Sequence, residues 1–396
     1  MHREGARRVV RTLLLCLLTL SLAWSPAMAF DLGEWIPGLK VSPFFSEKLE
    51  YESNVFQVPS HSRSDEIFKA IPGFIADYTF GPHSVSVGYR AEILNYMDLT
   101  DQNTTNHFAV GQLRLDFPRT LLTLREDFAR TNSPPGTELT GPIVSDTNIL
   151  KPEAEYRLTQ RFGLGLNYSW THVTFEQQST ADLIDRDDQL VGTSFFWKFT
   201  PKADLFLNYS YGWTTFAQSS DNRNYTSNNV TVGVRGDITA KLSSSLRVGY
   251  TIENVANSSQ SGYTGFIVSG DTTYRPTERI SLTLSTQRAR QESTFGTNAF
   301  YVTSNGTLSG QYQILPKLGL TARLGGGINN YSTKQSADGK TDFREDTFIL
   351  AGSTLDYDIQ PWLRAGLEYS RIGRDSNFPS FRFVDDRISG RVTVQF

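Results

Sequence analysis

The residues of this chain best suited to chemistry are charged side chains that alternate with apolar ones. An arginine stands two positions before a carboxylate in Arg90/Glu92, Arg114/Asp116, Arg125/Asp127 and Arg235/Asp237. Side chains two apart on a β-strand share one face, where opposite charges can pair. The set that we place on this polar face is Arg90, Glu92, Arg114, Asp116, Arg125, Asp127, Arg235, Asp237, Arg247, Arg323, Arg364, Glu368 and Arg391. Such a face would meet a solute directly or stabilise a wall through salt bridges, and the two roles are compatible.

Enzyme chemistry finds little support in the sequence. The histidines after residue 29 are His61, His83, His107 and His172. No HExxH, GxSxG, paired-histidine or Cys/His metal spacing occurs. A serine–histidine pair around His172 would have to assemble in space, without a sequence feature that selects it. We therefore predict no catalytic residue, no metal and no cofactor.

The elements that must position these side chains are β-strands. Over residues 203–215 leucine and aromatic side chains alternate with mostly polar or small ones, and the same period of two recurs over 242–252 and 318–324. This period is typical of strands with one apolar and one polar face. Helix signals are nearly absent after residue 29.

Tight turns punctuate the strands near residues 82, 119, 160, 202, 240, 277, 316 and 360, about 37 to 44 residues apart. Longer polar connections alternate with them, at Val58–Ser64, Asn132–Ser145, Gln178–Asp185, Ser219–Arg223, Ser258–Ser261, Thr333–Thr341 and Asp375–Pro379. A fixed period indicates one repeated architecture. Short turns at one end and longer loops at the other are typical of outer-membrane barrels.

Eight tight turns join sixteen strands, and one more strand lies at each end, around Val41–Asn54 and over Phe381–Phe396. We therefore predict an all-β fold, a transmembrane antiparallel β-barrel of about 18 strands, within two, with both termini on the tight-turn, periplasmic side. The alternative is a soluble secreted β-helix or several β-sandwiches. Solenoid repeats are shorter than this period, and sandwiches would show linkers.

The first 29 residues differ from the rest of the chain. Basic residues precede an apolar run from Leu13 to Trp24, and Pro26-Ala27-Met28-Ala29 follows. This layout predicts a secretory signal peptide, 1–29, cleaved after Ala29. The run is too short for a membrane anchor, which needs about 20 apolar residues. Cleavage leaves a short periplasmic segment, 30–40, and the barrel, 41–396, without a cysteine and without the basic patch that nucleic acid requires.

The last residues and the aromatic residues also suit a membrane barrel. Val392, Val394 and Phe396 share one parity at the end of the chain. They resemble the signal that barrel-assembly machinery reads, so this machinery and outer-membrane lipid and lipopolysaccharide are the expected partners. Aromatic residues near strand ends, such as Trp197 and Trp362, are expected in the two interfacial girdles rather than in sugar-binding platforms.

The segments Glu50–Phe56, Asp65–Ile67, Ile71–Phe74 and Val87–Glu92 resemble the putative β-barrel porin 2 family. The similarity is clearest over 41–96, and the later hairpins match only generically. The resemblance implies an outer-membrane barrel and no catalytic residue. Members are frequently associated with exopolysaccharide or capsule export, which implies passage of a polysaccharide and contact with export components.

General diffusion of small hydrophilic solutes and a non-conducting barrel that displays its loops are the two alternatives. The segment 30–40 is too short for a plug domain, so we expect an unplugged lumen. The third long connection, Thr131–Ser145, contains Pro134-Pro135-Gly136, and our hypothesis is that it folds inward and narrows the lumen.

Overall fold

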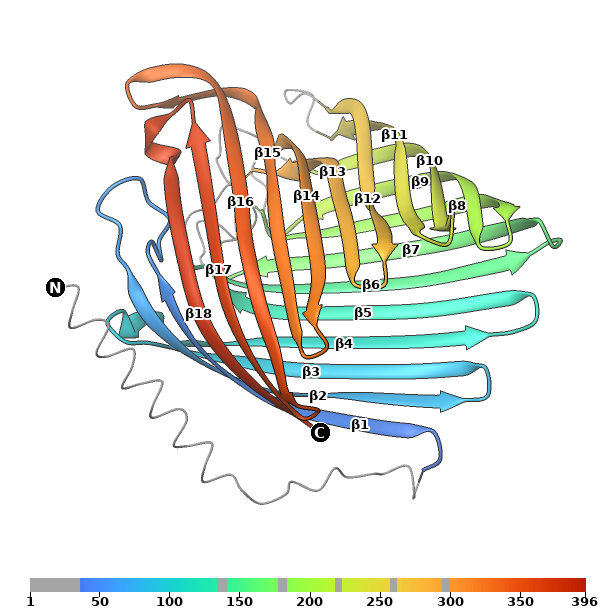
Figure 1. Cartoon of the computed structure of the whole chain (residues 1–396). Coiled ribbons are helices and arrows are strands. Elements are labelled where there is room, and N and C mark those ends of the chain that lie inside the picture. Colours follow the sequence, from blue (N-terminus) through green and yellow to red (C-terminus); the bar gives the residue numbers. More distant parts are fainter. Residues whose placement is uncertain (1–35, 134–140, 177–183, 218–222, 257–261, 294–299) are drawn as a thin grey trace.

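The computed structural model describes residues 36–133, 141–176, 184–217, 223–256, 262–293 and 300–396. The described residues form eighteen β-strands and two short 3-10 turns, at Thr100–Gln102 and Pro379–Phe381. The strands are β1 (Leu39–Glu52), β2 (Asp65–Phe80), β3 (His83–Tyr96), β4 (Thr104–Asp116), β5 (Thr120–Asn132), β6 (Val144–Arg157), β7 (Phe162–Phe175), β8 (Arg186–Thr200), β9 (Ala203–Phe216), β10 (Tyr225–Asp237), β11 (Leu242–Val255), β12 (Thr264–Thr277), β13 (Ile280–Glu292), β14 (Phe300–Leu315), β15 (Leu318–Ala337), β16 (Lys340–Gln360), β17 (Leu363–Ser376) and β18 (Phe383–Gln395) (Figure 1). Within these ranges no helix is long and apolar enough to cross a membrane.

The strands close into one antiparallel barrel. Each strand pairs with its neighbours in the chain, and β1 pairs with β18 from Phe44↔Gln395 to Glu52↔Arg387. Closure lets neighbouring strands satisfy each other's backbone groups along the barrel, except at the loop-side ends of β12 and β13, where the ladder stops at Val268↔Arg288. The predicted all-β fold and the count of 18 strands are confirmed.

The barrel has two different ends. Tight turns such as Gly81-Pro82 and Pro201-Lys202 lie at one, which we call the turn end, and the longer connections lie at the other, the loop end. β1 begins and β18 finishes at the turn end, as expected from the even strand count (Figure 1). That this end is periplasmic stays a prediction. The predicted signal peptide, 1–29, lies outside the described residues.

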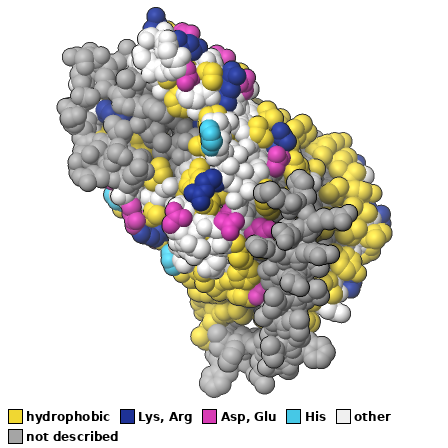
Figure 2. All heavy atoms as spheres, turned by 90° about the vertical axis from the view of Figure 1, so that its left-hand side faces the viewer, with side chains coloured by type: hydrophobic (Ala, Val, Ile, Leu, Met, Phe, Trp, Pro, Cys, Tyr) yellow, Lys and Arg dark blue, Asp and Glu magenta, His cyan; other side chains and the backbone are white. Residues whose placement is uncertain are grey.

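Apolar side chains cover the outer face of the wall. Leu166, Leu324 and Leu367 are each about two-thirds exposed, at 64%, 67% and 66%. In Figure 2 hydrophobic side chains cover the flank, whereas charged and polar side chains gather toward the loop end. So much exposed apolar surface fits a hydrocarbon environment rather than water.

The few tightly packed apolar clusters lie at the loop end. The largest joins Val55, Ile67, Leu94, Tyr96 and Leu99, from the wall and the connections beside it. The Asp65 carboxylate accepts hydrogen bonds from the backbone N–H groups of Leu99, at 2.7 Å, and Asp98, at 3.1 Å. This carboxylate therefore fixes the β3–β4 connection against the wall.

Two connections at the loop end meet near this cluster. A Cβ built on Gly141, where the third long connection re-enters the described chain, would lie 3.9 Å from Phe56 of the first connection. Gly141 is buried. The third connection thus reaches the first across the ends of β2–β5, although its Pro134-Pro135-Gly136 lies outside the described residues.

One predicted loop is a strand instead. The sequence assigned Thr333–Thr341 to a connection, but β15 runs to Ala337 and β16 begins at Lys340. Only Asp338 and Gly339 form the turn, both with positive φ, 53° and 75°. An Asp-Gly pair adopts these angles readily and favours a two-residue hairpin, so the ladder continues through the polar segment.

Candidate functional site

The inner face of the barrel carries the charged residues selected from the sequence. The register places all thirteen on the parity opposite the exposed leucine and aromatic side chains. Three of the four expected in-strand pairs form. Arg90 Nε lies 3.2 Å from Glu92 Oε1, Arg114 Nη2 lies 2.9 Å from Asp116 Oδ2, and Arg125 Nη2 lies 2.6 Å from Asp127 Oδ1. Exposed pairs of this kind add little stability.

The fourth pair, Arg235 with Asp237, does not form, and the prediction is wrong. The register runs unbroken through both residues, so they share a parity, but Gly236 between them has a φ of +106° and Asp237 lies exposed at the turn end. Arg235 instead binds two carboxylates of other strands. Its Nη2 lies 2.8 Å from Glu155 Oε2 and 3.2 Å from Asp204 Oδ2.

An aromatic ring supports this three-residue cluster. The Arg235 guanidinium lies over the Phe196 ring, 3.9 Å from its centroid. Gly165 makes room for that ring, since a Cβ there would approach Phe196 Cε2 to 2.7 Å. Phe196 and the neighbouring Phe206, 6.2 Å away between centroids, face inward. Neither ring was predicted to line the lumen, because aromatic residues were expected in the outer girdles rather than on the inner face.

Most of the other selected charges are neutralised by partners on other strands. Glu368 pairs with Lys48 at 3.1 Å, Arg391 with Asp356 at 2.8 Å, and Arg364 with Asp358 at 2.6 Å. Two arginines differ. Arg247 donates to Ser269 Oγ at 2.8 Å, and Arg323 makes no ion pair with any described residue. That these thirteen residues line a conducting lumen stays a prediction.

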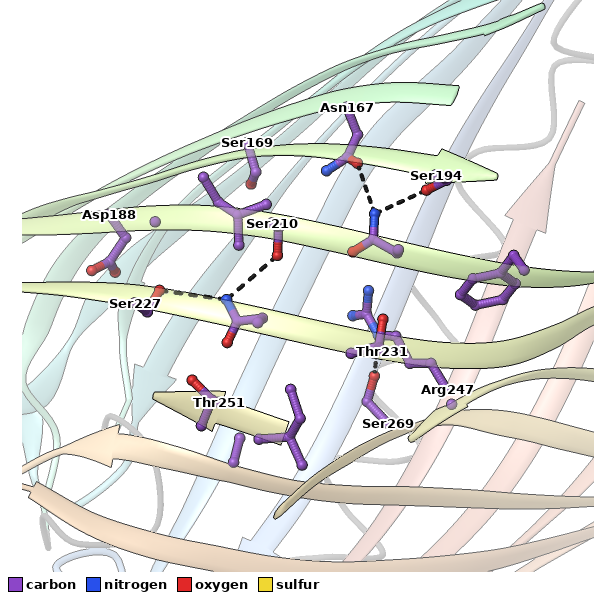
Figure 3. Close-up of a pocket in the computed structure, with 18 of the residues that line it drawn as sticks. Asn167, Ser169, Asp188, Ser194, Ser210, Ser227, Thr231, Arg247, Thr251 and Ser269 are labelled. Atoms are coloured by element: carbon purple, nitrogen blue, oxygen red, sulfur yellow. Dashed lines mark hydrogen bonds between the residues drawn. The ribbon is translucent and has the colours of Figure 1, made fainter. Parts of the chain in front are cut away.

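A cavity of about 920 Å³ opens along the inner face of β6–β13. Its middle is lined by uncharged hydrogen-bonding side chains, which we call the neutral stripe: Asn167, Ser169, Ser194, Asn208, Ser210, Ser227, Asn229, Thr231, Thr251 and Ser269 (Figure 3). Asn208 Nδ2 donates to Ser194 Oγ at 2.9 Å, and Asn229 Nδ2 lies 3.4 Å from both Ser210 Oγ and Ser227 Oγ. Thr251, Ser210 and Thr231 are buried, and the accessible hydroxyl and amide groups of the stripe retain further donor or acceptor capacity for a solute.

Charged groups border the neutral stripe at both ends. The Arg235 cluster and Arg247, which donates to Ser269 Oγ of the stripe, lie toward the turn end, and Asp188, Glu253 and Arg290 lie toward the loop end. The described residues hold no group of three or more His, Cys, Asp or Glu side chains placed to bind a metal. His172 contacts Asp187 at 2.9 Å on the outer face, beside the Trp170 ring, so its neighbours belong to the outer aromatic layer.

Comparison with known proteins agrees with this architecture. The family model described as Putative beta-barrel porin 2 matches residues 32–396. No curated protein matches the chain in sequence. Among solved structures, the outer membrane protein OpdK from Pseudomonas aeruginosa aligns at 11% identity and a TM-score of 0.49, over 90% of this chain and 99% of that chain. OccAB3 from Acinetobacter baumannii aligns at 10% identity and a TM-score of 0.48, over 91% and 100%. Because the family model spans nearly the whole chain, this protein belongs to the putative β-barrel porin 2 family and is a porin-like β-barrel channel of the bacterial outer membrane.

Proposed function

We propose that the channel conducts small hydrophilic solutes and prefers uncharged, hydrogen-bonding ones. The observation that carries the proposal is the neutral stripe, bordered at the turn end by the internally paired Arg235 cluster. The Arg235 cluster alone carries one cation and two carboxylates, but the whole cavity lining is nearly balanced, with four arginines and five carboxylates. Opposite charges that lie close together cancel most of each other's field at a distance, so an ion of either sign gains little from them. Hydroxyl and amide groups exchange hydrogen bonds with a solute at little cost, as they do with water. In this proposal the barrel transports its solute without chemical change.

Ion selectivity tests the proposal directly. We expect the refolded protein in a planar bilayer to conduct ions, with a reversal potential near zero in a KCl gradient. Asn229→Asp places a charge in the neutral stripe and should make the channel cation-selective. Asn254→Asp is the matched control, because this asparagine is exposed on the outer parity of β11. Strong selectivity of the unmodified protein for one sign would contradict the proposal.

Passage of a polysaccharide, implied by the family resemblance, is the finer alternative. Its support here is that the neutral stripe offers the hydroxyl and amide partners that a saccharide uses. Adding oligosaccharides of graded size to one side of the bilayer separates the two. Length-dependent block favours a saccharide path, and indifference to sugars favours general diffusion. A folded barrel without conductance would refute both and favour loop display.

We also propose that barrel-assembly machinery recognises Val392, Val394 and Phe396. The register gives Val394 the partner Phe45 on β1, and Phe396 is 39% exposed, so an outward apolar row ends the chain. Replacing Phe396 with serine should lower the amount of heat-modifiable barrel in outer membranes. Replacing Gln395, on the other parity, should not.

A further inference from the structure

The ladder between β12 and β13 stops before either strand ends. Its last pair toward the loop end is Val268↔Arg288. β12 continues to Thr264, paired only with β11, and β13 continues to Glu292, paired only with β14. Residues 264–267 and 289–292 therefore leave a seam in the wall. In Figure 1 the upper end of β13 bends away from β12.

The side-chain contacts of β13 show where its loop-side end lies. Leu284 and Arg290 have the same parity, and Leu284 is exposed on the outer face. Arg290 Nε nevertheless lies 3.0 Å from Glu253 Oε2, and its guanidinium lies 4.1 Å from the centroid of the Tyr225 ring. Glu253 and Tyr225 belong to the inner faces of β11 and β10 and line the cavity. The end of β13 therefore lies inside the wall, with its outer face against the inner face of its neighbours.

Buried charges hold this arrangement. We call Arg223, Glu253, Arg290 and Glu292 the latch. Arg290 contacts Glu253 and Glu292, and Arg223 Nη2 lies 3.7 Å from Glu292 Oε2. The four side chains are only 5–10% exposed. An apolar contact adds to the latch, since the Tyr263 ring packs edge-on against Phe300, 5.7 Å between centroids.

A second irregularity in the wall lies beyond β14, between β15 and β16. β14 stays paired with β15 up to Tyr301↔Tyr331, where the two rings stack at 5.1 Å. The ladder between β15 and β16 is irregular between Asn330 and Lys334. The loop-side ends of β13, β14 and β15 thus form one unit between the seam and this irregularity.

We propose that this unit is a gate, and that the latch holds it in the closed position described here. In the open position the unit returns to the wall and completes the ladder between β12 and β13. Continuing the register from Val268↔Arg288 pairs Phe266 with Arg290 and Thr264 with Glu292. Arg290 and Glu292 would then leave the lumen and face outward at the loop end. The inference rests on the proposed function as a channel.

The physics favours two states of similar free energy. Buried ion pairs gain little net stability, because removing the charges from water offsets most of their attraction. The unformed ladder bonds between residues 264–267 and 289–292 would each contribute modestly when formed. The net stability from the latch and that from the missing ladder bonds are both small, so the closed and open positions differ little in free energy. A small difference allows the less stable position to be populated.

Paired cysteines test the gate, since the only native cysteine, Cys16, lies in the predicted signal peptide. Glu253→Cys with Arg290→Cys places thiols at two positions whose longer native side chains meet in the closed position, so a reducible bifunctional thiol reagent is used to bridge them. This cross-link should lower single-channel conductance, and reduction should raise it several-fold. Phe266→Cys with Arg290→Cys joins residues that meet only in the open position. Because Arg290→Cys also removes the central residue of the latch, the disulfide of this pair should form readily and hold the conductance high.

Leu284→Cys with Leu308→Cys is the control, because these residues already face each other on β13 and β14. Its oxidation should leave conductance unchanged. Two results would refute the gate in a protein that conducts. The first is a closed-position cross-link that forms but whose reduction leaves conductance unchanged. The second is an open-position disulfide that never forms. Absence of conductance in the unmodified protein and in every variant would instead refute the channel itself.

Discussion

Removing the charge of Arg235 should turn a nearly unselective channel into a cation-selective one. Arg235→Gln leaves Glu155 and Asp204 without their shared cation, which lies 2.8 and 3.2 Å from them. A cation in the vacated place, ~4 Å from each carboxylate, gains about 1 kcal/mol per carboxylate at the permittivity of water. The side chains are 19–33% exposed, so we discount the sum to between about 1 and 2 kcal/mol. That corresponds to a local cation enrichment of about tenfold.

The assay is the reversal potential in a KCl gradient, measured at low ionic strength where screening is weak. Arg125→Gln is the comparison, because Arg125 is 50% exposed and its ion pair is with one carboxylate, Asp127. It should shift the reversal potential less. A triple variant, Arg235→Gln with Glu155→Gln and Asp204→Asn, removes one positive and two negative charges, and it should move the potential back past that of the unmodified protein, slightly to the anion side. An Arg235→Gln channel with normal conductance and unchanged selectivity would show that this cluster lies off the permeation path.

Three further substitutions probe stability. Arg344→Ala should destabilise the loop end by about 3–5 kcal/mol, because the buried Asp346 carboxylate loses the buried cation that it pairs with. The measurement is the temperature at which the folded band disappears on electrophoresis. The double variant Arg344→Met with Asp346→Leu should recover much of the lost stability. Gly236→Ala should cost about 1–3 kcal/mol, since φ is +106° and a Cβ would lie 2.1 Å from the Lys202 carbonyl oxygen; an unchanged urea-unfolding midpoint would contradict this. Asp65→Ala should expose the β3–β4 connection to limited proteolysis by removing its backbone acceptor, whereas conductance should persist.

The fold was predictable because its signals are local. Alternation assigns the two faces of each strand, and the recurring tight turns give the hairpins and their number. The error at Thr333–Thr341 has the same origin. Polarity suggested a loop there, but the Asp338-Gly339 turn chemistry, which favours a tight hairpin, decided the outcome.

The site was predictable only in part, because it depends on contacts between distant strands. In-strand pairs such as Arg125 with Asp127 follow from spacing two along one strand. The Arg235 contact with Glu155 spans 80 positions and depends on the room that Gly165 leaves for Phe196. The sequence analysis omitted Arg290 from the inner face, because alternation places it outward wherever the ladder is continuous. The seam at Val268↔Arg288 removes that condition.

The distribution of packing explains why function concentrates where it does. The closed ladder satisfies the backbone, and lipid covers the apolar outer face, so the middle of the inner face has no core to fill. It is free to carry small side chains such as Ser210 and Ser227, which keep the cavity wide and polar. The loop end differs, because side chains pack closely there, as Tyr263 does with Phe300 and as the buried latch residues do with one another. Close packing has discrete arrangements rather than a continuum. Under the two proposals above, solute selection belongs to the loosely packed middle, and opening and closing belong to the tightly packed end.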